Sequence, residues 1–144
     1  MEIQADFNVN STKKTIKFND FLQLIEDESK NMDKIRSPKF RLAGDDFSID
    51  VYPDNSANDW SGSIGVYLHN YGNEDQTISI SVKESTGEKE SLEMEEVEAG
   101  DRLEVPLILS HSDYREWAED HGDVFKLEVM VTVHSKAEGD GWTR

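Results

Sequence analysis

Apolar and polar residues alternate along most of this chain, and a period of two predicts β-strands with one buried and one solvated face. The clearest stretch is residues 37–68, where three short alternations are separated by turn-forming residues. Because the connections are too short for parallel crossovers, the pattern predicts an all-β fold, an eight-stranded antiparallel β-sandwich. The predicted strands cover residues 15–18, 40–42, 47–51, 64–68, 78–82, 90–98, 103–109 and 124–134.

The alternation breaks at a few places that predict other features. Helical spacing of apolar residues over 18–25 and 110–120 predicts one or two short helices. A slip of the period at Glu96–Val97 predicts a β-bulge there. Pro106 has no N–H to donate, so its strand is expected at the edge of a sheet. The last strand is the longest and most hydrophobic, which favours a central position.

The inward-facing positions of these strands form the predicted core. They share the buried parity of each alternation. The predicted core residues are Phe40, Phe47, Ile49, Val51, Ile64, Val66, Leu68, Ile78, Ile80, Val82, Leu103, Val105, Leu107, Leu127, Val129 and Val131.

Length and composition indicate one domain with a sizeable core. The chain has 144 residues, of which 35% are hydrophobic, and it contains no cysteine. We expect a flexible lead over 1–13, the sandwich over 14–135 and a flexible tail over 136–144. The N-terminus has no apolar segment typical of a secretory signal, and no apolar run reaches the roughly 20 residues that span a bilayer. A cytoplasmic protein is expected.

The net charge of −16 comes from 31 acidic and 15 basic residues. A surface of this charge repels nucleic acid and anionic membranes, so neither is expected as a partner. It permits a basic partner, although acidic surfaces also serve solubility alone. The densest acidic run is 88–104, which is either a solvated strand face or a surface selecting basic or hydroxyl-rich peptides.

No motif of nucleophilic catalysis is present in the sequence. Without cysteine, a Gly-x-Ser-x-Gly elbow or a glycine-rich phosphate loop, we expect no enzyme and no cofactor. Carboxylate pairs arise by chance at this acidic content, so an enzyme using two carboxylates stays an open class.

Two clusters of potential metal ligands are weak candidates. The loop Asp54–Asp59 is rich in oxygen ligands but lacks the EF-hand spacing, so a solvated turn is favoured over calcium binding. A second cluster contains two histidines that are ten residues apart, which is not the spacing of a helical zinc pair. Its members are His111, Asp113, His121 and Asp123.

The order of the motifs in residues 37–68 resembles that of the MATH domain, also called the TRAF-C fold. A Ser-Pro-x-Phe entry at Ser37 is followed by a glycine turn, a strand ending in Val-Tyr-Pro, a polar loop and a strand ending in Val-Tyr-Leu. The resemblance extends over roughly 14–135. It implies a non-catalytic module that binds an extended peptide in a shallow groove, as adaptors for substrates or receptors do. The implied groove residues are Tyr67, Ile78, Val97, Glu98, Ala99, Gly100 and Asp101.

The chain departs from the family pattern within this groove. Substrate-selecting members carry an aromatic Trp-Gly-x cluster where this chain has Ala99-Gly100-Asp101, and the usual tryptophan of the first strand is also replaced. The implied groove is therefore less aromatic and more acidic, and its partner is expected to be basic or rich in Ser and Thr. The alternative function, of a different kind, is that of a β-sandwich that binds calcium, glycan or lipid through the loops at its end.

Overall fold

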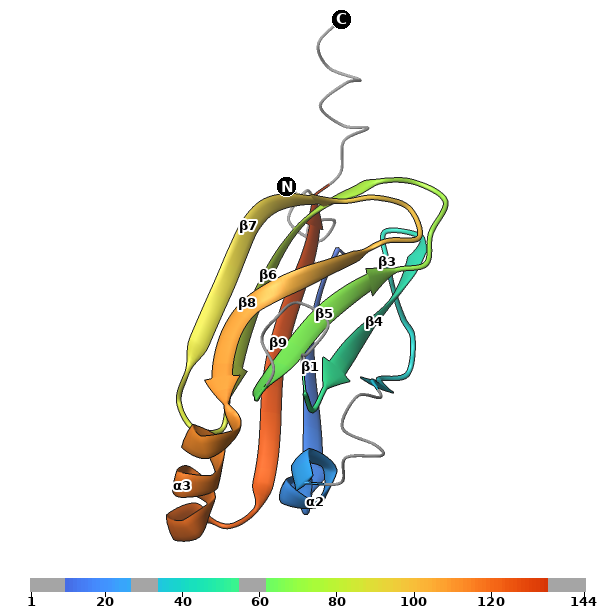
Figure 1. Cartoon of the computed structure of the whole chain (residues 1–144). Helices are drawn as coiled ribbons and strands as arrows, with labels where there is room; N and C mark the ends of the chain where they lie inside the picture. The colour runs from blue at the N-terminus through green and yellow to red at the C-terminus, as the bar shows by residue number, and fades with distance from the viewer. Residues whose placement is uncertain (1–9, 27–33, 55–61, 135–144) are drawn as a thin grey trace, which may run out of the picture.

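The computed structural model describes residues 10–26, 34–54 and 62–134, and it shows two antiparallel β-sheets packed face to face (Figure 1). The predicted all-β sandwich is confirmed. Two short helices, α2 (Phe21–Glu26) and α3 (His111–His121), lie at the same end of the sandwich. None of the helices within these ranges is long and apolar enough to cross a membrane.

The first sheet has the order β1-β9-β6-β7. Its strands are β1 (Ser11–Asn19), β9 (Val124–His134), β6 (Gln76–Glu84) and β7 (Lys89–Val97). The predicted central position of the last strand is confirmed, since β9 lies between β1 and β6. The first strand begins at Ser11, so the expected flexible lead over 1–13 extends too far into the chain.

The second sheet has the order β2-β4-β5-β8, with β3 also paired to β4. Its strands are β2 (Ile35–Arg36), β3 (Phe40–Leu42), β4 (Asp45–Tyr52), β5 (Ser63–Asn70) and β8 (Arg102–Ser110). The two-residue strand β2 is the one strand that the sequence pattern did not predict. Strand β8 lies at the edge of this sheet, as Pro106 predicted.

The core lies between the two sheets and matches the predicted parity. Thirteen of the sixteen predicted core residues are buried, including all those of β4, β5, β6 and β9. Phe40 and Leu103 are only partly buried against the core, and the side chain of Leu107 lies outside the described part of the structure. The core extends beyond the strands to Phe21, which stacks on Phe125 at the helical end, and to Tyr114, whose ring meets Phe125 edge to face.

Asp123 connects the two helices through hydrogen bonds to a residue of each. The helix α3 begins after Ser110, whose hydroxyl accepts the Asp113 N–H and so caps the helix. Asp123 follows α3, and its carboxylate accepts both the Tyr114 hydroxyl at 2.9 Å and the Leu22 N–H of α2 at 3.0 Å. A residue distant in sequence thereby satisfies an N–H group at the start of α2.

The β-bulge of β7 lies earlier than the sequence predicted. The pairing of β6 with β7 shifts between Ile78 and Ile80, whose partners are Glu95 and Leu92, so the one extra residue is at 93–94 and not at Glu96–Val97. Met94 adopts φ +56° there, and its N–H donates to the Ser79 hydroxyl. The bulge restores the inward direction of Val97 and leaves Met94 60% exposed.

Candidate functional site

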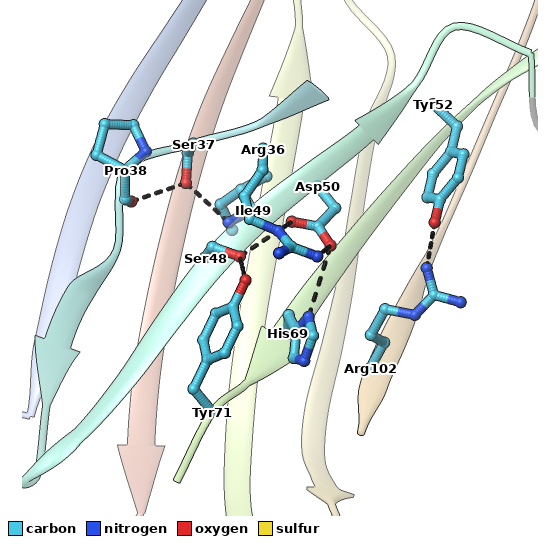
Figure 2. Close-up of polar contacts among 10 residues, drawn as sticks. All are labelled: Arg36, Ser37, Pro38, Ser48, Ile49, Asp50, Tyr52, His69, Tyr71 and Arg102. Atoms are coloured by element: carbon cyan, nitrogen blue, oxygen red, sulfur yellow. Dashed lines mark hydrogen bonds and ion pairs between the residues drawn. The ribbon is translucent and has the colours of Figure 1, made fainter. Parts of the chain in front are cut away.

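The outer face of the second sheet carries a cluster of polar and aromatic side chains, which we call the outer-face cluster (Figure 2). It arises from the period of two, because the strands that send apolar residues inward send polar residues of opposite parity outward. Its members come from β2, β4, β5 and β8 and from the residue that follows β5. They are Arg36, Ser48, Asp50, Tyr52, Tyr67, His69, Tyr71 and Arg102, and Figure 2 draws all of them except Tyr67.

Asp50 is the fully buried carboxylate of this cluster. Arg36 reaches it with two guanidinium nitrogens, Nε at 3.1 Å from Oδ1 and a terminal nitrogen at 3.3 Å from Oδ2. The Ser48 hydroxyl donates to the same carboxylate at 2.9 Å. The hydrogen bond to Asp50 raises the pKa of Arg36 above its ordinary value. A buried charge is thus satisfied by one cation and one hydroxyl, as a buried carboxylate requires.

His69 lies beside this pair and is only partly solvated. Its Nδ1 is 3.7 Å from Asp50 Oδ2, and this nitrogen has no hydrogen-bond partner among the described residues. Burial lowers the pKa of His69, and the approach to Asp50 opposes this effect. The imidazole stacks on the Tyr71 ring with 4.0 Å between centroids. His69 has the outward parity of β5, but neighbouring side chains cover most of it.

Tyr71 joins the carboxylate network to exposed cations. Its hydroxyl is 2.9 Å from the Ser48 hydroxyl. The Lys39 ammonium lies 4.1 Å from the centre of its ring, within the range of a cation–π contact. The ring therefore has a cation and an imidazole for neighbours.

Tyr67, Tyr52 and Arg102 form the part of the cluster next to the edge strand β8. The two tyrosine rings meet edge to face with 5.2 Å between centroids. The Arg102 guanidinium lies 5.0 Å from the Tyr67 ring centre and donates a hydrogen bond to the Tyr52 hydroxyl. Tyr67 is on the outer face but only 7% exposed, because these neighbours cover it.

The turn from Val97 to Asp101 connects β7 to this cluster. Glu98, Ala99, Gly100 and Asp101 are exposed, whereas Val97 belongs to the core. Asp101 N–H donates to the Glu98 carbonyl, and Gly100 has φ +78°, which together describe a tight turn that requires glycine. The buried side chain of Asn70 donates to the carbonyls of Val97 and Glu98 and so fixes the start of the turn.

The structure does not bring all the predicted groove residues to one surface. Ile78 is fully buried between the sheets on β6, so its prediction as a groove residue is wrong, and its prediction as a core residue is confirmed. Its parity on β6 points inward, which leaves it no surface to offer a ligand. Tyr67 and the turn 98–101 remain near each other through Arg102, which pairs with His69 across β5 and β8.

The potential metal ligands do not assemble among the described residues. No group of three or more His, Asp or Glu side chains in the described ranges is placed to hold an ion. His111 contacts the Pro53 carbonyl, and Asp123 holds the two helices together. Asp54 accepts the Gly62 N–H, while the rest of the loop Asp54–Asp59 lies outside the described residues.

Sequence reasoning missed the charged members of the outer-face cluster. Asp50 occupies an outward position between the buried Ile49 and Val51, and Arg36 lies on a strand too short to give a pattern. A charged residue within a strongly hydrophobic run was the available signal, because such a residue needs a partner once the strand is buried. The identity of that partner depended on the pairing of β2 with β4, which brings Arg36 opposite Asp50.

No protein-family model matches this chain, and no curated protein matches it in sequence. Among solved structures, the chain is similar to TRAF5 of Notothenia coriiceps, with a TM-score of 0.54 and 18% sequence identity. The similarity covers 85% of this chain and 73% of that chain. At this identity the likeness shows the fold alone, and it agrees with the two-sheet arrangement. The chain therefore has a β-sandwich fold of the TRAF-C type.

Proposed function

We propose that this chain is a divergent MATH-type, non-catalytic interaction module that binds an extended segment of a partner protein along β8. The observation that carries the proposal is the position of β8, an edge strand whose outer-face neighbours are Tyr52, Tyr67 and Arg102. An extended peptide that adds a strand to a sheet gains backbone hydrogen bonds, and its alternate side chains contact the neighbouring face.

The hydrogen-bond pattern of β8 supports this mode. The Asn70 N–H donates to the Asp101 carbonyl, and the pairs Leu68–Leu103 and Val66–Val105 follow on the same parity. Since antiparallel ladders alternate, the backbone groups of Arg102 and Glu104 are directed away from β5, and the register of the pairing then shifts between Val105 and Leu109. The Arg102 N–H is bonded to the Asp101 side chain at 2.8 Å, and Pro106 has no N–H. A partner strand would therefore accept no hydrogen bond at Arg102 or Pro106 and would bond to the Arg102 carbonyl oxygen.

The charges around β8 indicate the chemistry of the partner. Glu98 and Asp101 are exposed on the turn that leads into the strand, and β7 adds Glu95, which is exposed and pairs with the inward-facing Ile78. We propose a segment that is basic or rich in Ser and Thr, because carboxylates attract cations and accept hydroxyl hydrogen bonds. Arg102 is held by the two tyrosines and shapes the contact surface beside the acidic turn.

Binding of a library of extended peptides, measured as association and dissociation rates, tests the proposal. Tyr67→Ala removes the ring that supports Arg102 and Tyr52, so peptide dissociation should be faster. Glu98→Lys and Asp101→Lys should mainly slow association of a basic peptide, and added salt should do the same to the wild type. Glu119→Lys on the exposed face of α3 is the matched control, since it makes the same charge change away from β8.

Peptides that bind all three variants and the wild type equally would exclude the β8 edge as the site. Melting curves of each variant separate a lost contact from a lost fold. Peptides that bind only with calcium, and no longer bind after substitution of Asp54 and Asp59, would favour the end-loop alternative.

A further inference from the structure

Five lysines lie on the outer face of the first sheet, on the opposite side of the molecule from the outer-face cluster. We call this surface the lysine face, and its members are Lys13, Lys17, Lys83, Lys89 and Lys126. All five are exposed, and none of them is in an ion pair with a described residue. They come from all four strands of the sheet.

The strand register sets lysines directly opposite each other at two places. Lys17 of β1 pairs with Lys126 of β9, and Lys83 of β6 pairs with Lys89 of β7. Like charges at directly opposed positions destabilise a sheet, by an amount of the order of tenths of a kcal/mol to about 1 kcal/mol for each pair. The fold gains nothing from these two pairs, whereas an anionic ligand would relieve both.

Most of the other residues on the lysine face carry no charge. Ser and Thr side chains occupy most of the remaining outward positions, and Met130 lies among them with 46% of its surface exposed. Glu128, opposite Lys83, is the acidic residue within the basic rows. Further acidic residues lie around the margin, Glu88 on the turn before β7 and Glu93 and Glu96 on the far part of β7.

The net charge of −16 gives no indication that these five lysines lie together on one face of the molecule. The sequence predicted that anionic surfaces would be repelled, which holds only where the net charge is spread evenly over the molecular surface. Packed sheets lie about 10 Å apart, which exceeds the Debye length of about 8 Å at physiological ionic strength. A surface that meets the lysine face therefore experiences the lysines more strongly than the acidic residues beyond the other sheet.

The chemistry of the face selects among anionic partners. It has lysines and no arginine or aromatic residue at the paired outward positions, whereas interfaces between proteins are enriched in arginine and aromatics and depleted of lysine. Bases of single-stranded nucleic acid need aromatic platforms for stacking. Lysines spread over a broad surface, with one exposed apolar side chain, match the diffuse negative charge of a lipid headgroup layer.

We propose that the lysine face docks the protein on an anionic membrane surface. The lysines approach the headgroups, and Met130 contacts the boundary of the acyl region. In this orientation the second sheet and the β8 edge are on the side away from the bilayer. The surface proposed for a protein partner is separate from the lysine face, so either proposal can fail without the other.

Co-sedimentation of the full chain with lipid vesicles tests the proposal. The protein should bind vesicles of phosphatidylcholine mixed with phosphatidylserine and should not bind phosphatidylcholine alone. Removing one lysine near such a surface costs about 1 kcal/mol, so Lys17→Gln with Lys126→Gln should weaken partition by roughly thirtyfold. Lys83→Gln with Lys89→Gln should have an effect of the same order. High salt should release the wild type.

Lys34→Gln with Lys39→Gln is the matched control, because both lysines are exposed and belong to the opposite sheet region. This variant should bind nearly as well as the wild type. Equal loss in the control and the test variants would overturn the proposal, since the effect would then follow net charge alone. So would an absence of binding to phosphatidylserine vesicles at low salt. Binding of soluble polyphosphate or of a polyglutamate peptide without vesicle binding would assign the lysines to a soluble polyanion instead.

Discussion

The backbone carbonyl of Asn70 accepts a hydrogen bond from Gly100 at 2.9 Å, while the Asn70 N–H donates to Asp101 at the same distance. Gly100 and Asp101, which directly precede β8, thus both oppose Asn70 at the end of β5. Gly100 lies in the left-handed region at φ +78°. This is the geometry of a glycine bulge that follows a tight turn. The backbone at this position therefore requires glycine, whatever side chains flank it.

Gly100→Ala is expected to destabilise the protein by about 1–2 kcal/mol, because an L-residue pays that much in the left-handed region. A Cβ at this position would meet no atom within 4 Å, so the cost comes from the backbone and not from crowding. Gly100→Asn should cost less, since asparagine tolerates this conformation. Urea unfolding of the three proteins measures the difference, and equal stability of the alanine variant and the wild type would contradict the assigned turn.

Arg36→Ala should cost about 1.5–3 kcal/mol in unfolding free energy, because it leaves the buried Asp50 carboxylate with fewer donors. Arg41→Ala is the comparison, since Arg41 Nε is 3.2 Å from Asp46 Oδ1 and the corresponding Arg36 distance to Asp50 is 3.1 Å. The Asp50 side chain is fully buried and that of Asp46 is 41% exposed. The exposed pair should therefore contribute 1 kcal/mol or less. Equal losses would show that burial of Asp50 does not set the energy of this pair.

Glu84→Gln should change how stability depends on pH. Glu84 is buried, its Oε2 has no hydrogen-bond partner among the described residues, and burial raises its pKa above the ordinary value of 4.5. The folded state then binds the proton more tightly than the unfolded state. The stability that this gives is fully present below the ordinary pKa and is lost as pH rises through the folded pKa.

The glutamine variant cannot ionise at this position, so its stability relative to the wild type should rise over that pH range and then level off. Urea unfolding at a series of pH values measures this. Glu98→Gln, an exposed change on the turn beyond the other end of β6, should leave the pH profile of the wild type unaltered. A parallel profile for Glu84→Gln would mean that the raised pKa is wrong.

Val129→Ala should destabilise by about 1–3 kcal/mol, because Val129 is fully buried on the central strand and its methyl groups leave a cavity. Glu128→Ala, the outward neighbour on β9, should cost much less. Thermal and urea unfolding of the two variants compare the two faces of one strand. A larger loss for Glu128→Ala would reverse the register of β9 against its neighbours.

The sequence predicted the strands well because their signal is local. Ile78, Ile80 and Val82 alternate within five residues, and the buried face follows directly from this spacing. Pro106 likewise predicted an edge strand, because proline has no backbone N–H to donate. These inferences needed no knowledge of which strand lies beside which.

The candidate site was harder to predict because it depends on pairing between distant segments. Arg36 meets Asp50 only through the β2–β4 register, and Lys17 meets Lys126 only through the β1–β9 register. The prediction of Ile78 as a groove residue failed for a different reason, because the local alternation already directed its side chain into the core. The bulge at 93–94 was misplaced because the alternation of β7 is masked by glutamates on both faces.

The pairing of β1 with β9 also has a consequence for the order of folding. Strand β9 lies between β1 and β6, and Ser11 of β1 pairs with Thr132 of β9. The centre of the first sheet therefore cannot form until β9, the last described strand, has been synthesised. Contacts of such long range slow folding, because the chain must close a large loop before they form. During synthesis on the ribosome, β4 and β5 can pair early, whereas β1 stays unpaired until β9 has emerged. The lysines of β1 then disfavour its pairing with strands of other chains.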